Sequence, residues 1–199
     1  MTKEDYGKKL NENLQDLLLR IRRGAYHPKA SRIVEIPKAD GSLRPLAISC
    51  TEDKIVQAAA KRIIESIYES LFTNDSHGFR PKRGCYTALI ALRKALMNST
   101  CGAVLEIDLK KFFNTIPQAH LEMMMRHKIK DEKFLYLLLK LLKVPTLDND
   151  GKIVSNEIGS PQRSLPSDLC ERLKALSKSL SLDWRNSEYL CTKVKRKSL

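Results

Sequence analysis

A stretch in the middle of the chain, residues 104–116, combines carboxylates with aromatic rings. Alternating apolar and polar residues predict that it begins as a strand, with Glu106 and Asp108 on the same face. Two aromatics follow, and Phe113 stands five residues after Asp108. This spacing suits a nucleotide pocket in which a carboxylate lies close to an aromatic ring.

The two carboxylates have two interpretations. Carboxylates are depleted in strand interiors, so two on one face need a reason. One reason is a divalent cation, because Mg²⁺ prefers oxygen ligands and takes one or two carboxylates beside substrate phosphates. The other is an edge strand whose acidic residues face water.

The composition indicates which partners the chain suits. It has 199 residues, of which 42% are hydrophobic, enough to build a core in one domain or two small ones. The formal net charge is +13, an excess that favours polyanions, meaning nucleic acid or anionic lipid. No apolar run reaches 18 residues, so no membrane partner is expected.

The cysteines favour a reducing compartment. Five are scattered along the chain without a Cys-x-x-Cys pair, so neither a zinc site nor a disulfide framework is indicated. The first residues lack the apolar core of a signal peptide. A cytoplasmic location is therefore expected.

An amphipathic helix is predicted over residues 3–23, with Gly24 as its stop. Arg20, Arg22 and Arg23 cluster near its end. They could serve only to complement the helix dipole, or they could contact phosphates.

A β-hairpin is predicted over residues 31–48, because Asp40 and Gly41 form a strong turn signal between two apolar arms. Lys38 and Arg44 flank the turn. Either the hairpin is simply solvated, or it is a flap that brings two cations over a triphosphate.

A basic loop is predicted over residues 76–84, between helices over 52–72 and 86–97. The inward face expected for the first helix is Ile55, Val56, Ala59, Ile63, Ile64, Ile67 and Leu71. In the loop, Arg80, Lys82 and Arg83 surround Phe79. Cations interleaved with an aromatic suit a nucleic-acid strand, because cations neutralise phosphates and the ring can meet a base.

The second half is expected to be mostly helical. Pro117 should open a helix at its first turn, and a strongly apolar helix is predicted over 131–143. Residues 148–151 resemble part of a calcium loop, but the remaining ligands are missing. A hairpin turn between short arms is the better interpretation.

Five segments, taken in order, resemble the reverse transcriptases encoded by group II introns, whose longer members are also maturases. The resemblance covers about residues 10–162. The segments are IPKADGSLRPL from Ile36, DKIVQ from Asp53, HGFRPKRGC from His77, EID from Glu106 through to Ile116, and GSPQ from Gly159.

The resemblance implies an α+β fold. Residues 1–100 would form mainly helical fingers with a β-hairpin, and residues 101–162 an incomplete palm sheet. The remaining residues, 163–199, form an atypical basic tail that ends in a run expected to be solvated or disordered.

The resemblance also implies roles for single residues. Asp108 resembles the first catalytic aspartate, a metal ligand, with the backbone carbonyl of Leu109 as a second ligand. The expected nucleotide-binding residues are Lys38, Arg44, Phe113 and Gln162. The expected nucleic-acid-binding residues are Phe79, Arg80, Lys82 and Arg83, together with Arg20, Arg22 and Arg23. The implied cofactor is Mg²⁺, and the implied partners are an RNA template or intron RNA, a DNA primer and deoxynucleoside triphosphates.

The sequence departs from the family pattern after Gln162. Arg163 stands where the family has glycine, and no Tyr-x-Asp-Asp hairpin follows to supply two further aspartates. A frameshift or rearrangement at this point is one interpretation of the tail. Three hypotheses result: a truncated RNA-directed DNA polymerase that is inactive alone, a non-catalytic RNA-binding module, and a decayed gene product.

Overall fold

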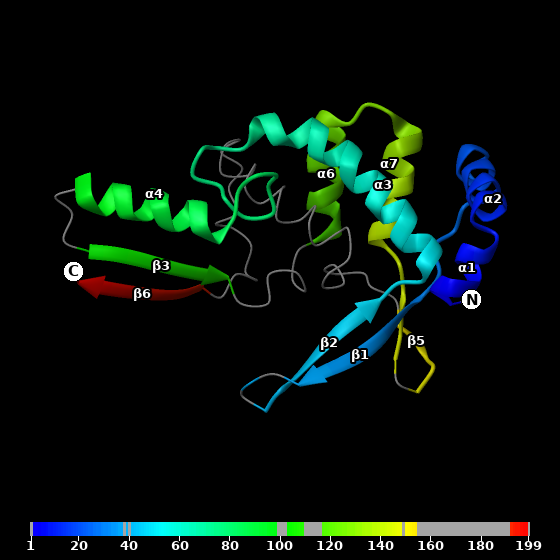
Figure 1. Cartoon of the computed structure of the whole chain (residues 1–199), viewed down its shortest axis with the longest axis horizontal. Helices are drawn as coiled ribbons and strands as arrows, with labels where there is room; N and C mark the ends of the chain where they lie inside the picture. Colours follow the sequence, from blue (N-terminus) through cyan, green and yellow to red (C-terminus); the bar gives the residue numbers. More distant parts are fainter. Residues whose placement is uncertain are drawn as a thin grey trace.

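The computed structural model describes residues 2–37, 39, 41–98, 103–109, 117–148, 150–154 and 192–198; at Arg44 and in the segments 103–109 and 192–198 it describes the backbone alone. Figure 1 shows the arrangement of these elements. The helices are α1 (Lys3–Lys8), α2 (Leu10–Arg22), α3 (Thr51–Tyr68), a 3-10 turn (Glu69–Leu71), α4 (Cys85–Asn98), α6 (Gln118–Lys128) and α7 (Glu132–Leu142). The strands are β1 (Ser31–Pro37), β2 (Leu43–Ile48), β3 (Ala103–Leu109), β4 (Thr146–Leu147), β5 (Ile153–Val154) and β6 (Thr192–Ser198).

The N-terminal region forms two helices, where the sequence predicts one. The break falls at Lys9, whose φ of −123° and ψ of 41° are not helical. The Asn13 side chain donates to the carbonyl of Tyr6 at 3.0 Å, and Tyr6 itself is buried. This side-chain bond supplies the partner that the last turn of α1 needs, so the chain can turn while Tyr6 stays in place.

The predicted hairpin is confirmed and belongs to a small mixed sheet. Strands β1 and β2 pair antiparallel, and Gly41 takes a φ of 78° at the turn between them. The sheet order is β2-β1-β4-β5, with β1 and β4 parallel and β4 and β5 antiparallel. The predicted hairpin turn at 148–151 lies between β4 and β5, and Gly151 there takes a φ of 74°.

The core lies among helices α2, α3, α6 and α7. Helix α6 follows Pro117, which is its N-cap and lies one residue before the first turn in which it was predicted. The Asp131 carboxylate accepts from the backbone N–H groups of Lys133 and Phe134 at the start of α7. Figure 1 shows the long helix α3 beside α6 and α7. The buried residues are Leu17, Tyr26, Val56, Ala60, Ile64, Tyr68, Leu121, Met124, Met125, Ile129, Leu135, Leu138, Leu141 and Leu142.

The inward face of α3 differs from the predicted one. Ala59 and Ile63 are exposed, and the buried stripe runs Asp53, Val56, Ala60, Ile64 and Tyr68. These positions are three or four residues apart, so they do form one face of a helix. The prediction was wrong about two residues because Asp53 and Tyr68 have polar groups and were not counted toward the apolar face.

Burial of Tyr68 should make the protein less stable at alkaline pH. Its side chain is 0% exposed, its hydroxyl has no hydrogen-bond partner among the described residues, and burial raises its pKa to about 12. The tyrosine of the unfolded chain titrates near pH 10, so below pH 10 the contribution of Tyr68 to the free energy of unfolding is fully present. As pH rises towards 12, the unfolded chain releases this proton first. Stability should then fall by about 3 kcal/mol from this residue.

Comparison with Tyr68→Phe isolates this contribution. Urea unfolding at pH 8 and pH 11 should show a smaller alkaline loss for Tyr68→Phe than for the wild type. At pH 8 the variant should be as stable or about 1 kcal/mol more stable, because an unpaired buried hydroxyl is removed. An equal alkaline loss in both proteins would contradict the assignment.

Strand β3 pairs antiparallel with the C-terminal strand β6 (Figure 1). The register joins Glu106 to Lys195 and Asp108 to Lys193. The run 193–197, for which the sequence predicts a solvated or disordered end, therefore lies in a strand. Four of its five residues are cations and Val194 is the only apolar one, so the run has no period-2 pattern from which a strand could be predicted.

Helix α4 carries no buried residue although it is rich in apolar side chains. Tyr86, Leu89, Ile90 and Met97 are all more than half exposed. The helix has 14 residues, and no helix in the described part of the chain is both long and apolar enough to cross a membrane.

Candidate nucleic-acid interface

The central strand carries the expected catalytic aspartate. Asp108 and Leu109 are the last two residues of β3, so the prediction that Asp108 lies in a strand is confirmed. The backbone pairs Asp108 with Lys193 and Leu109 with Thr192. Phe113 and Gln162, which the resemblance places near the nucleotide, lie outside the described residues.

The hairpin reaches out from the helical core (Figure 1). Arg44 lies on β2 opposite Ile36 of β1, one pair from the end of the ladder. Lys38, its expected partner at the other side of the turn, lies outside the described residues. The position of Arg44 near the tip suits a flap, because the tip is the part of a hairpin that reaches furthest from the core.

Arg80 organises the basic loop from the inside. Its guanidinium forms a salt bridge with Glu69 at 2.9 Å and donates to the carbonyl oxygens of Thr73 at 2.8 Å and Ser76 at 3.1 Å. It also lies over the ring of Phe72, 5.0 Å from its centre. The side chain is 8% exposed. The sequence predicts a direct contact between Arg80 and nucleic acid, whereas in the structure the Arg80 guanidinium points inward and bonds to residues in and just before the loop.

Arg83 and Thr87 hold the second half of the loop. Arg83 donates to the carbonyl oxygens of Asn74 and Ser76. The Thr87 hydroxyl accepts from the Gly84 N–H at 3.0 Å and lies 2.9 Å from Nδ1 of His77. These bonds fix the loop to the first turn of α4. Sequence reasoning missed the role of Thr87, for which only the Gly-x-x-Thr spacing at the helix start gives a signal.

Phe79 and Lys82 are displayed on the outside of this loop. Both adopt the left-handed backbone region, with φ of 54° and 59°, which is uncommon for residues other than glycine. Phe79 is 58% exposed, and Lys82 is also exposed. Residues in such strained conformations persist where surrounding contacts hold them, and they gather at functional sites. The network of Arg80 and Arg83 supplies these contacts.

The three arginines at the end of α2 have different environments. Arg20 pairs with Asp16 at 2.7 Å and with Glu52 of α3, and these carboxylates raise its pKa. Arg22 and Arg23 are exposed. Arg20 therefore ties α2 to α3, while Arg22 and Arg23 remain accessible to phosphate groups.

A buried carboxylate, to which the sequence pattern assigned no role, connects these elements. Asp53 is 1% exposed and accepts from the Tyr26 hydroxyl at 2.5 Å and from the Lys29 N–H at 3.0 Å. Burial, followed by the bond to Asp53, raises the pKa of Tyr26. Asp53 thus fixes the linker between α2 and β1 to the start of α3, next to the Arg20–Glu52 pair.

Within the part of the chain whose side chains are described, no three His, Cys, Asp or Glu side chains gather into a potential metal site. Asp108 is outside this test, because only its backbone is described. The described residues instead form a basic loop fixed by hydrogen bonds, an exposed aromatic side chain and an accessible basic helix end, features that suit a nucleic-acid strand.

Solved structures with the same fold define the class of protein. The chain superposes on a reverse-transcriptase-containing assembly, the partial Cas6-RT-Cas1--Cas2 complex, with a TM-score of 0.52 and 18% identity, covering 88% of this chain and 30% of that one. It superposes on apo telomerase from Candida tropicalis with a TM-score of 0.54 and 13% identity, covering 83% and 44%. The α+β fold, with fingers and a partial palm of the reverse transcriptase type, is thereby confirmed.

Sequence similarity identifies the family. A profile described as "Reverse transcriptase (RNA-dependent DNA polymerase)" matches residues 36–162, and the chain belongs to this family. It is 35% identical over 159 residues to the group II intron-encoded protein LtrA of Lactococcus lactis subsp. cremoris, covering 79% of this chain and 26% of LtrA. It is 38% identical over 136 residues to the putative COX1/OXI3 intron 2 protein of Saccharomyces cerevisiae, covering 68% of this chain and 16% of that protein.

These relatives place the chain among the group II intron reverse transcriptases and maturases. The family generally uses divalent metal ions and nucleic-acid substrates that include an RNA template. The chain spans 26% of the length of LtrA and 16% of the length of the COX1/OXI3 intron 2 protein.

Proposed function

We propose that this chain provides the RNA-gripping fingers and the first catalytic aspartate of a group II intron-type RNA-directed DNA polymerase. The observation that carries the proposal is the basic loop that displays Phe79 and Lys82, which lies inside the region matched by the family. Its expected partners are intron or template RNA, a DNA primer and deoxynucleoside triphosphates.

The residues divide the chemistry between them. Lys82, Arg22 and Arg23 neutralise RNA phosphates, and Phe79 offers a ring on which a base can stack. Lys38 and Arg44 on the hairpin hold the triphosphate of the incoming nucleotide. Asp108, with the carbonyl of Leu109, would hold Mg²⁺, which when bound supplies charge neutralisation for nucleotidyl transfer.

One aspartate is too few for the two-metal reaction. The sequence contains no Asp-Asp pair that would complete the set. The purified 199-residue chain should therefore bind RNA but should not extend a primer with Mg²⁺, template and nucleotides. Primer extension by this chain alone would contradict the assignment of an incomplete site.

A salt series on RNA binding tests the proposed grip. Affinity for a structured RNA should fall steeply with salt in the wild type. Lys82→Ala should flatten the slope of log K against log salt by about 0.7 to 0.9, the value for one lost phosphate contact. The measurement is fluorescence anisotropy at several salt concentrations.

Arg80→Ala is the matched comparison, because the residue lies in the same loop and its loss removes the same charge. Its guanidinium is bonded to Glu69 and to carbonyl groups, so the variant should lose affinity without flattening the slope. If Arg80→Ala flattened the slope as much as Lys82→Ala, Arg80 would contact phosphate directly. An affinity unchanged from low to moderate salt would reject the proposed grip altogether.

A further inference from the structure

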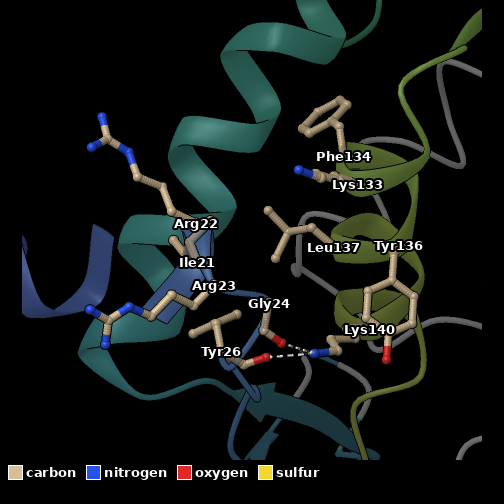
Figure 2. A pocket seen from close by; sticks show the side chains of 10 residues that line it. All are labelled: Ile21, Arg22, Arg23, Gly24, Tyr26, Lys133, Phe134, Tyr136, Leu137 and Lys140. Atoms are coloured by element: carbon tan, nitrogen blue, oxygen red, sulfur yellow. Dashed lines mark hydrogen bonds between the residues drawn. The ribbon is translucent and has the colours of Figure 1, made fainter. Parts of the chain in front are cut away.

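A half-open pocket of about 550 Å³ lies where the end of α2 meets one side of α7. Figure 2 shows it between Ile21 and Gly24 on one side and Phe134, Leu137 and Lys140 on the other. The elements that form it are distinct from those of the basic loop and from β3. Its volume falls within the range of pockets that hold small organic ligands, about 300–1,000 Å³.

The charged side chains that line the pocket, among the residues that the structure describes, are all cationic. They are Arg22, Arg23, Lys133 and Lys140. Lys140 is already bonded, because it donates to the carbonyl oxygens of Gly24 at 3.1 Å and Tyr26 at 2.8 Å. It closes one end of the pocket and holds the α2 end against α7 (Figure 2).

The other three cations are accessible. Arg22, Arg23 and Lys133 are exposed, and neither arginine forms an ion pair within the described residues. Figure 2 shows Lys133 reaching from α7 toward α2, and the guanidinium groups of Arg22 and Arg23 extending away on the α2 side. An anionic group at this mouth would meet Lys133, while Arg22 and Arg23 add positive charge on the α2 side.

The remaining surface is apolar and partly aromatic. Ile21, Phe134 and Leu137 pack against the core with one side and line the pocket with the other. Tyr136 adds a ring that is 57% exposed, with the Lys140 ammonium 4.6 Å from its centre. A flat ring that carries a phosphate matches this combination of an apolar floor and a cationic mouth.

We propose that this pocket binds one unpaired nucleotide of an RNA held by the chain. Its base lies against Leu137 and the Tyr136 ring, and its phosphate lies near Lys133. This inference rests on the proposed RNA binding and adds a site that recognises an unstacked nucleotide. Recognition of this kind suits RNA, because unpaired bases can leave the stack and meet an aromatic side chain.

Two RNA hairpins of equal length test the pocket, one fully paired and one with a single unpaired nucleotide in its stem. The wild-type chain should bind the second RNA more tightly, by between about fivefold and 150-fold, the range that stacking of one base contributes. An RNA with an abasic site at the unpaired position should lose this preference, because it keeps the phosphate and lacks the base.

Substitutions at exposed positions then assign the preference to this pocket. Tyr136→Ala should remove most of the preference, and Tyr136→Phe, which keeps the ring, should retain it. Lys133→Ala should weaken binding of the RNA with the unpaired nucleotide more than binding of the paired RNA. Lys128→Ala, which removes an exposed lysine outside the pocket, should not change the preference.

The outcomes separate the two proposals. If the wild type binds both hairpins equally tightly, RNA binding stands and the pocket proposal is overturned. If it binds neither hairpin, both proposals fail. A preference that survives Tyr136→Ala and Lys133→Ala in folded protein would also overturn the pocket proposal, because the recognition would then lie elsewhere.

Discussion

Substitution of alanine for the aspartate at the position of Asp108 should abolish DNA synthesis by a full-length relative while RNA binding is retained. Metal ions contribute several kcal/mol of charge stabilisation to the transition state. Each 1.36 kcal/mol corresponds to tenfold in rate, so the loss should be about a thousandfold or more. RNA affinity should change little, because it comes from cations on other elements.

The measurement is primer extension together with RNA binding on the same protein preparation. Asp108→Asn is the second variant, because it keeps the size of the side chain and removes its charge. Both variants should be inactive and should bind RNA as tightly as the wild type. DNA synthesis retained by either variant would reject the assignment of Asp108 as a metal ligand.

A second large effect is expected in stability. Asp53→Ala should lower the free energy of unfolding by roughly 3–5 kcal/mol, because it removes the charged acceptor of two hydrogen bonds. The Tyr26 hydroxyl and the Lys29 N–H would lose their partner. Tyr26 is 1% exposed, so water cannot readily replace the carboxylate.

Urea unfolding of wild type and variants measures this effect. Asp75→Ala is the control: Asp75 is exposed, just before the basic loop, and its loss should change stability by less than about 0.5 kcal/mol. Tyr26→Phe and the double variant complete a cycle that isolates the Tyr26–Asp53 bond. If Asp53→Ala and Asp75→Ala lower the free energy of unfolding by the same amount, Asp53 does not anchor the linker.

Local sequence patterns predicted most of the elements. The Asp40–Gly41 turn predicted the hairpin, Pro117 predicted the start of α6, and the spacing of apolar residues predicted α7. Each of these signals depends on neighbouring residues alone. The helix break at Lys9 could not be predicted in this way. It depends on Asn13 bonding to Tyr6 across a turn and on a core that holds Tyr6 in place.

The roles of the individual cations were also beyond local patterns. Arg80 and Lys82 lie two residues apart in the same basic segment, yet one is turned into the loop and the other faces outward. The difference comes from Glu69 and Phe72, which tertiary folding brings to Arg80. Composition predicted that the loop was basic, and only the structure shows which of its cations are accessible.

The tie between Lys140 and the carbonyl of Gly24 joins residues 116 positions apart. Ribosomes add about 5–20 residues per second, so α2 is made roughly 6 to 23 seconds before its partner on α7. During that time Leu17 and the linker through Tyr26 can pack on α3 but lack α6 and α7, which complete the core. The nascent fingers should therefore depend on chaperones, and slow codons before α7 should lengthen the period in which the N-terminal helices are open to proteases.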